Sequence, residues 1–311
     1  KVIEICLESP IICCLKNDFS INCRKYPAFK ETSPTSTKKN PERREYLTSL
    51  LKSQSESLMI DISALTPAGM TQMVFLLLVL ASLITSFMTA AFGIGGGVVL
   101  IVIMAMLVPP AALIPIHGII QLGSNGGRVV IMAKDVIWRP MIPFVMGALI
   151  GATAGGLLAV QLPIWLVQLG LGIFILVIVF AKLPPIQQKY IFAGGIISTF
   201  LTMFFGATGN FIAAMVKTMK LDPLPHVATH SIMMTFQHFI KVIVFGMVGF
   251  HFAPYWPLVI GMLISGFIGT VIGRQFLVKA GQHYFKPILN TILALAACRL
   301  IYAGIAGIME G

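Results

Sequence analysis

The chain has 311 residues, of which 57% are hydrophobic and only 11% are charged, and its formal net charge is +11 at pH 7. Soluble globular domains carry about 25% charged residues, so the composition excludes a soluble protein and indicates a multi-pass membrane protein. Most basic residues of the apolar region lie at the edges of apolar segments instead of in a soluble patch, which argues against a nucleic-acid-binding protein.

Residues 1–58 differ in composition from the rest of the chain. They hold ten of the 22 basic residues and none of the 17 methionines. Their polar, turn-rich sequence favours disorder, and their four cysteines lack the spacing of a metal site. We therefore expect a disordered leader over residues 1–58 that is not native, with Met59 or Met70 as the true start.

Ten apolar segments follow this leader. A helix needs about 20 residues to cross a hydrocarbon core of roughly 30 Å. The second segment of each set of five is shorter than that and directly follows a glycine cluster, which is typical of a broken helix or of one arm of a re-entrant hairpin. The ten segments span about 71–91, 93–108, 111–132, 141–160, 163–181, 190–205, 206–219, 224–248, 255–273 and 287–308.

The first five segments resemble the second five in sequence. SLITSFMTAAFGIGGG, residues 82–97, aligns with GIISTFLTMFFGATGN, residues 195–210, at an offset of 113. After one extra residue in the second copy, an offset of 114 pairs Pro109 with Pro223. Glycine interruptions at matching places in two halves are typical of secondary transporters, in which broken helices face a site at the membrane midplane.

The number of crossings in each half decides how the halves are oriented. Five crossings, an odd number, would invert them, whereas four crossings with a re-entrant loop would leave them parallel. Ten crossings place every basic loop on one side, as Lys and Arg require on the cytoplasmic side: Lys134, Arg139, Lys182, Lys189, Lys217, Lys220, Arg274, Lys279 and Lys286. The sequence therefore predicts an all-α polytopic membrane protein with a first membrane repeat over residues 59–181 and a second over residues 182–311, arranged as an inverted five-plus-five repeat with a period of about 114 residues.

The glycine motifs carry a family resemblance. FGIGGG with a downstream Pro-Pro pair, and its second copy FGATGN followed by LDPLPHVATHS, resemble the TauE/SafE sulfite exporter family over about residues 70–308. This resemblance implies a membrane carrier or exporter of small anions, often sulfur oxyanions or organosulfonates. The first copy departs from the family pattern, because Pro115, Ile116 and His117 stand where an Ala-x-x-Thr-Ser run is expected.

The two glycine clusters are the first candidate binding elements. Irregular backbone survives in a membrane only where protein or a water-filled cavity surrounds it. Free N–H groups and the positive dipole end of a helix suit an anion, so we expect the clusters to begin the short helices at a binding site. Close helix packing is the alternative. The predicted residues are Gly93, Gly95, Gly96, Gly97, Gly206, Thr208, Gly209 and Asn210.

Polar stripes on the third segment of each half are the second candidate. His117, Gln121, Ser124 and Arg128 share one helical face, and polar groups in a membrane avoid lipid. Interhelical hydrogen bonding is the alternative. At the offset of 114, the second stripe comprises Ser231, Thr235 and His238, near Thr229 and with Lys241 and Gln237 beside it.

The ionisable members of these stripes have more specific predicted roles. Lys241 lies deep in its segment with no intramembrane Asp or Glu to pair with, so it either snorkels to an interface or serves as the counter-charge of an anion. His117, His230 and His238 titrate near neutral pH in their ordinary state and are candidates for coupling protons to transport.

No motif points to an enzyme. The chain lacks HExxH, GxSxG, a Walker loop and an intramembrane aspartate pair, so we expect neither catalysis nor a metal or other cofactor. The predicted function is a secondary transporter or exporter of small anions, such as sulfite or organosulfonates, with proton coupling. Its predicted location is the plasma or inner cell membrane, with no nucleic-acid partner and no oligomeric state assigned. An anion channel and a non-transporting membrane assembly protein are the alternatives.

Overall fold

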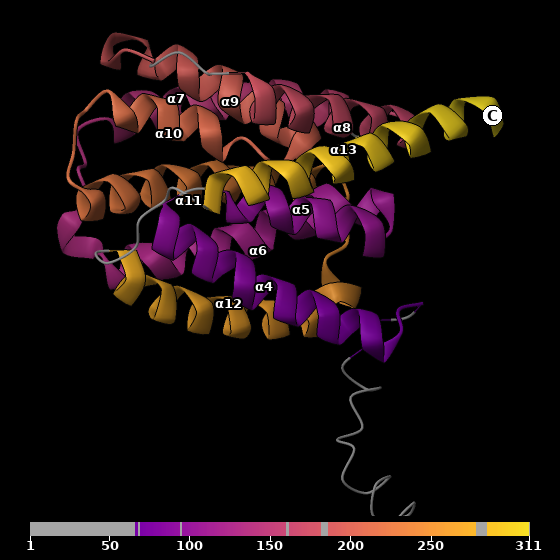
Figure 1. Cartoon of the computed structure of the whole chain (residues 1–311). Coiled ribbons are helices and arrows are strands. Elements are labelled where there is room, and N and C mark those ends of the chain that lie inside the picture. Colours follow the sequence, from indigo (N-terminus) through magenta and orange to yellow (C-terminus); the bar gives the residue numbers. More distant parts are fainter. Residues whose placement is uncertain are drawn as a thin grey trace, which may run out of the picture. The chain divides into compact units, whose positions relative to one another are not determined.

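The computed structural model describes residues 66–67, 69–93, 95–159, 162–181, 186–277 and 285–310, so the predicted leader lies outside the described residues. Within these ranges all ten long elements are α-helices (Figure 1). The first half holds α4 (Gln72–Phe92), α5 (Gly96–Leu107), α6 (Pro110–Ile131), α7 (Met141–Ala159) and α8 (Ile164–Phe180). The second holds α9 (Ile191–Phe205), α10 (Gly209–Lys217), α11 (Pro223–Met247), α12 (Trp256–Leu277) and α13 (Phe285–Glu310).

The glycine clusters break the chain where the sequence predicted breaks. Gly93 ends α4 with a φ of 83° and Gly206 ends α9 with a φ of 65°, a left-handed conformation that glycine adopts without strain. These two glycines therefore close the long helices, whereas we expected them to begin the short ones. Gly95, with a φ of 101°, precedes α5, and Thr208 precedes α10.

Helices from the two halves pack in exchanged pairs. The first helix of each half packs against the fourth helix of the other, so α4 lies along α12 and α9 lies along α7 (Figure 1). The third helices, α6 and α11, pack against each other, as do the fifth helices, α8 and α13. Such reciprocal pairing is expected of two similar halves that face one another.

Glycines bring the exchanged pairs into backbone contact. A Cβ atom added to Gly147 or Gly151 of α7 would overlap a carbonyl oxygen of α9, and one added to Gly269 of α12 would overlap the carbonyl oxygen of Leu83 in α4. Small residues allow this close approach in apolar surroundings, where dispersion contacts between helices replace the hydrophobic effect. The glycines of α7 thus serve helix packing.

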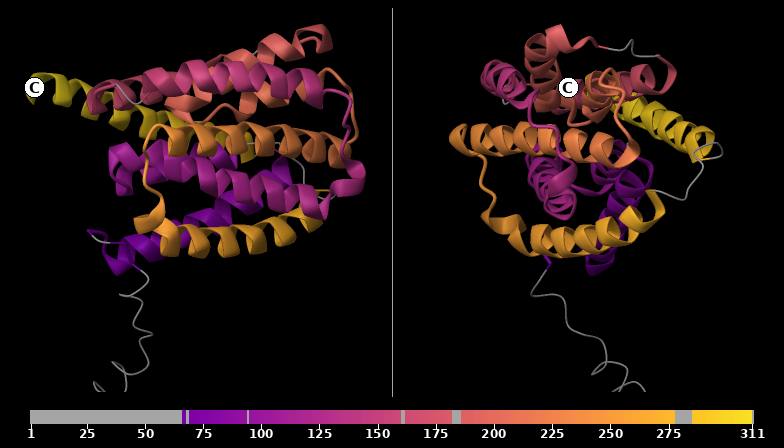
Figure 2. Two further views of the ribbon diagram at one scale, coloured as in Figure 1. Left: turned by 180° about the vertical axis from the view of Figure 1, so that it is seen from behind. Right: turned by 90° about the vertical axis from the view of Figure 1, so that its left-hand side faces the viewer.

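The third helices run in opposite directions. The amide of Ile137, just beyond the C-terminal end of α6, donates a hydrogen bond of 3.0 Å to Thr229 in the first turns of α11. In the left view of Figure 2, the connection from α6 to α7 lies at the right and the connection from α11 to α12 at the left. Antiparallel third helices are what an inverted repeat requires; the repeat's orientation in the bilayer stays a prediction.

Three of the described helical segments are long and apolar enough to cross a membrane: Gln72–Phe92, Met141–Ala159 and Ala253–Phe276. Shorter apolar helices cover Gly96–Leu107, Ile164–Phe180 and Leu293–Met309. The third helices of both halves are instead interrupted by polar side chains, most of them buried inside the protein.

Single-cysteine labelling tests the topology. In a cysteine-free background, Asp135→Cys and Gln275→Cys are expected to react only with reagent on the cytoplasmic side, because both residues lie beside basic connections. His251→Cys, in the connection after α11, is expected to react only from the opposite side. Labelling of position 135 from outside and of position 275 from inside would contradict the inverted arrangement.

Candidate anion-binding site

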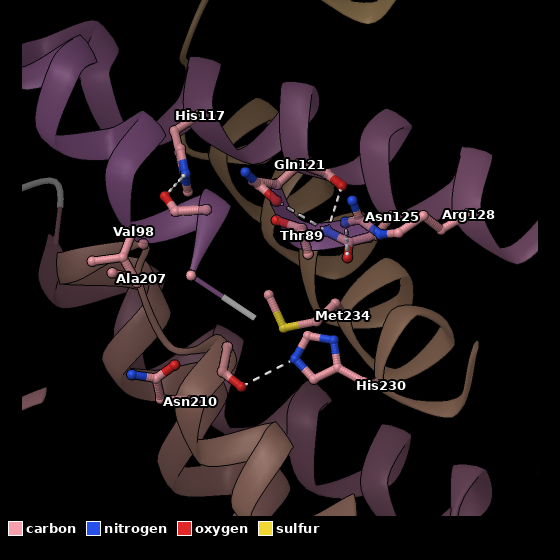
Figure 3. A pocket seen from close by; sticks show the side chains of 14 residues that line it. Thr89, Val98, His117, Gln121, Asn125, Arg128, Ala207, Asn210, His230 and Met234 are labelled. Carbon is pink, nitrogen blue, oxygen red and sulfur yellow. Dashed lines mark hydrogen bonds between the residues drawn. The ribbon is translucent and has the colours of Figure 1, made fainter. Parts of the chain in front are cut away.

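A cavity of about 30 Å³ lies between the two helix breaks, bounded by α6 and α11 (Figure 3). Eight of the predicted site residues line it: Gly95, Gly97, His117, Gln121, Arg128, Gly206, Gly209 and Asn210. The rest of its wall is Thr89, Val98, Asn125, Ala207, His230 and Met234. No carboxylate is among these residues, and the wall is rich in hydrogen-bond donors.

Arg128 is the cation of this cavity. Its side chain is only 1% exposed. Its Nε donates to Ser231 Oγ over 3.2 Å, its Nη1 donates to Ser124 Oγ over 3.3 Å, and its Nη2 donates to Asn125 Oδ1 over 2.6 Å. A guanidinium has five N–H donors, and these three acceptors are all neutral. The positive charge is therefore held in place by dipoles without a bonded counter-ion.

A polar relay along α6 sets the orientation of the neighbouring amides. The Nδ2 of Asn125 donates to the carbonyl oxygen and to the Oε1 of Gln121, over 2.7 and 3.1 Å. These bonds leave the Oδ1 of Asn125 for Arg128 and turn the oxygen of Gln121 toward Asn125. The side-chain amide of Gln121 lies over Gly97 at the start of α5, with its nitrogen as the nearest atom.

Two histidines contact the breaks in the same manner. His117 Nε2 lies 3.0 Å from the carbonyl oxygen of Gly97, and His230 Nε2 lies 3.1 Å from that of Gly209 (Figure 3). A carbonyl can only accept, so each Nε2 carries the proton, and the Nδ1 of a neutral ring is an acceptor. Both Nδ1 atoms are buried without a hydrogen-bond partner among the described residues.

Both short helices present their N-terminal ends to the cavity. Gly95 and Gly97 border it at the beginning of α5, and Gly209 and Asn210 border it at the beginning of α10. The first N–H groups of a helix have no intrahelical acceptor, and the helix dipole places partial positive charge there. Together with Arg128, these ends make the site electrostatically suited to an anion.

The other predicted residues lie outside the cavity wall. Ser124 and Ser231 hold Arg128, Thr208 donates to Gln237, Thr229 accepts from Ile137, and Thr235 donates to the carbonyl oxygen of Ser231. Gly93 caps α4, and Gly96 packs against α4. His238 and Lys241 form a separate buried group.

The register of the second polar stripe differs from the predicted one. The third helices begin at Pro110 and Pro223, an offset of 113, whereas we predicted 114 from Pro109. Contacts between the third and first helices agree with 113 in both partners, because Ser124 bonds Ser86 and Gln237 bonds Thr199. At this offset Gln237 corresponds to Ser124 and Lys241 corresponds to Arg128. The predicted stripe of Ser231, Thr235 and His238 is therefore one residue out of register.

This register also explains which residues the sequence missed. His230 was predicted only for proton coupling, and its place in the cavity wall follows from that of His117 at the offset of 113. Asn125 lies one position beside the predicted stripe and three residues before Arg128, a spacing that places the two side chains together on a helix. Thr89 is matched by Thr202 in the aligned glycine motifs, and this repetition was the available signal for it. Nothing in the sequence pointed to Met234.

Two broken helices that meet at a cationic cavity inside an apolar helical bundle are features of a membrane transporter. The chain belongs to the sulfite exporter TauE/SafE family, whose family model matches residues 78–300. No curated protein and no solved structure matched the chain. The predicted family is thus confirmed, and the chain is an all-α polytopic membrane protein of a transporter family, not of an enzyme family.

Proposed function

We propose that this protein is a secondary carrier that exports small sulfur oxyanions, sulfite or organosulfonates, across the plasma or inner cell membrane. The observation that carries the proposal is Arg128, a buried guanidinium at the wall of a cavity whose bonded acceptors are all neutral. An anion in the cavity would supply the missing counter-charge.

The energetic argument rests on the cost of burying a charge. A buried cation is strongly unfavourable unless it is paired and hydrogen-bonded. Acidic residues of the described chain are confined to Asp135, Asp222 and Glu310, which lie in connections or at a helix end. A planar guanidinium binds oxyanions with two parallel hydrogen bonds, and two of its five donors are left after the three bonds described above.

The size of the cavity favours a carrier over a channel. A water molecule needs roughly 10–15 Å³ of such space, so a cavity of about 30 Å³ admits only a small ligand. Broken helices at matching places in two halves are typical of carriers, which move one half against the other in every cycle. A channel instead needs a continuous open path.

The histidines support coupling to protons. In the neutral form of His117 and His230, the Nδ1 atom is a lone-pair acceptor, which repels an anion. Protonation turns the same atom into a charged donor. An anion that reaches these rings is therefore bound more strongly together with a proton than alone.

Flux into proteoliposomes tests the function. Radiolabelled sulfite is expected to enter in a saturable manner, with competition by methanesulfonate but not by equimolar chloride, and a proton gradient of matching direction is expected to accelerate it. Empty liposomes are the control. Linear flux without saturation would indicate a channel, and flux equal to that of empty liposomes would refute transport of this anion class.

A further inference from the structure

Lys241 is buried as completely as Arg128 but is not bonded. Its side chain is 0% exposed, and its Nζ has no hydrogen-bond partner in the described part of the chain. His238, one turn earlier on α11, is also fully buried, and neither of its ring nitrogens has a partner there. The His238 ring lies edge-on to the ring of His117, with 6.0 Å between centroids.

The surroundings of Lys241 correspond, residue by residue, to those of Arg128. At the offset of 113, Arg128 corresponds to Lys241 and Asn125 to His238. Ser124 bonds Ser86 of α4 over 2.8 Å, and its counterpart Gln237 bonds Thr199 of α9 over 3.2 Å. The same pattern of contacts thus recurs around both cations.

One replacement makes the two cations differ. Ser231, which accepts from Arg128, corresponds to Gly118, and Lys241 packs against Gly118. A Cβ atom added to Gly118 would lie 3.0 Å from Lys241 Cε. The glycine makes room for the long stem of the lysine but removes the hydroxyl acceptor, so the ammonium group is left without the bond that its counterpart has.

The two cations lie on opposite sides of the crossing between α6 and α11. Arg128 contacts the beginning of α11, whereas Lys241 contacts α6 at Gly118, ten residues before Arg128. At 1.5 Å per residue, the backbone positions of Arg128 and Gly118 are about 15 Å apart along α6, and the guanidinium extends from there toward Gly118 as far as Ser124. Arg128 is on the side of the basic connections, which is predicted to be cytoplasmic, and Lys241 is on the side of the uncharged connection after α11.

A second cavity adjoins the Lys241 side. It has a volume of about 310 Å³ and is bounded by the beginning of α6 and the end of α11. Ile114 and Phe245 line it, and they lie one helical turn from Gly118 and Lys241, respectively. Its lining residues are all apolar and do not include Lys241, His238 or His117, so this cavity is open space on the uncharged side near the group and is not itself the binding site.

We propose that Lys241, with His238 and His117, forms a second binding site for a small oxyanion, which the anion occupies from the non-cytoplasmic side. The proposal rests on the proposed transport function and assigns a different cation to each face of the membrane. Arg128 receives the anion from the cytoplasmic side. When the two halves exchange conformations, Lys241 takes the equivalent place and presents the anion to the opposite side.

The chemistry of the site favours an anion over a structural role. An ammonium group without an acceptor is costly in an apolar interior. The helices α6, α7, α9, α11 and α12 contain no Asp or Glu, so none of these neighbours supplies a counter-charge. A bound oxyanion would accept from Lys241 and from protonated imidazole nitrogens at the same time.

Sided transport measurements test this second site. In proteoliposomes that contain the full chain in one orientation, the half-saturating sulfite concentration is measured separately at each face. Lys241→Met is expected to raise it at least about tenfold at the non-cytoplasmic face, as for the loss of one charge-assisted hydrogen bond, and to leave the cytoplasmic face within about twofold. Lys241→Arg keeps the charge. Its half-saturating sulfite concentration at the non-cytoplasmic face is expected to lie between those of Lys241→Met and the unsubstituted protein.

A pair of glycine variants separates positioning of the lysine from damage to the fold. Gly118→Ala is expected to push Lys241 aside and to weaken binding at the non-cytoplasmic face only. Gly126→Ala, on the same helix, is the matched control, because its Cβ would lie 3.9 Å from the nearest side chain, that of Thr235. Its half-saturating sulfite concentration is expected to equal that of the unsubstituted protein at both faces.

Two results would overturn the second site: equal weakening at both faces in Lys241→Met, or unchanged half-saturation at both. Either result leaves the proposed carrier function standing as long as the unsubstituted protein shows saturable sulfite flux. Absence of that flux in the unsubstituted protein would instead refute the proposed function itself, so the two failures are distinguishable.

Discussion

Arg128→Gln is expected to abolish saturable sulfite uptake while the protein still inserts and folds. Glutamine keeps an amide donor for Ser124 or Ser231 but removes the positive charge of the cavity. Losing charge-assisted hydrogen bonds of about 1.5–3 kcal/mol each lowers affinity roughly tenfold to a hundredfold per bond. Arg128 has two donors left for a ligand, so the combined loss takes binding beyond a measurable range of concentrations.

Arg128→Lys is the informative companion. Lysine keeps the charge but replaces the planar fork with a single ammonium group that cannot reach Ser231, Ser124 and Asn125 together. We expect saturable uptake to persist with the half-saturating concentration raised about tenfold or more. Partial activity in this variant separates the requirement for charge from the requirement for guanidinium geometry.

Initial rates of radiolabelled sulfite uptake, at increasing sulfite concentration, measure both variants. Arg139→Gln is the matched control, because it makes the same chemical change at an exposed position in the connection between α6 and α7. It is expected to leave the half-saturating concentration within about twofold. If Arg128→Gln were to transport with unchanged affinity, Arg128 would have no part in anion binding, and only the helix ends would remain as the binding element.

Gly96→Ala is expected to prevent stable folding, whereas the equivalent Gly209→Ala is expected to fold. A Cβ atom at Gly96 would overlap the carbonyl oxygen of Thr85 and the hydroxyl oxygen of Thr89 in α4. Backbone cannot move aside as a flexible side chain can, so the cost reaches or exceeds the roughly 1–3 kcal/mol of ordinary overpacking. At Gly209 the nearest atoms, in His230 and Met234, would be 3.6 Å away, an ordinary van der Waals distance.

The amount of monodisperse protein in detergent and its thermal unfolding midpoint measure this difference. Gly209→Ala should match the unsubstituted protein in both, yet its methyl group enters the cavity wall and should reduce sulfite affinity. Gly126→Ala serves here too as the control for alanine at a roomy helical glycine. Equal stability of Gly96→Ala and Gly209→Ala would show that α5 does not pack against α4 as closely as described.

Local sequence was sufficient to place the helices. The ten predicted segments agree with α4 to α13 to within a few residues at most ends, because length, apolar content and glycine or proline breaks act on neighbouring residues. The burial of Arg128 and Lys241 was not decided by the sequence, because Arg128 lies in the last turn of α6 and both long side chains could have snorkelled to an interface. The leader over residues 1–58 and the orientation in the bilayer stay predictions.

Contacts between residues far apart in the sequence decided the rest. The offsets of 113 and 114 differ by only one residue. A shift of one residue along a helix is a rotation of about 100°, so the two offsets match residues on different helical faces. The contacts of Ser124 with Ser86 and of Gln237 with Thr199, which recur at 113 in both partners, chose between them. The same holds for Gly96 and Gly209, which are equivalent in sequence but meet backbone in one case and side chains in the other.

The sequence therefore determined which chemical groups the site contains, and the tertiary structure determined where they lie. The sequence alone shows that cations, histidines and helix breaks occur in both halves. Packing of α6 against α11 in opposite directions then separated Arg128 from Lys241, although the sequence placed them in one predicted site. The physical reason is that hydropathy and helical period act along one segment, whereas side-chain neighbours depend on how two antiparallel helices cross.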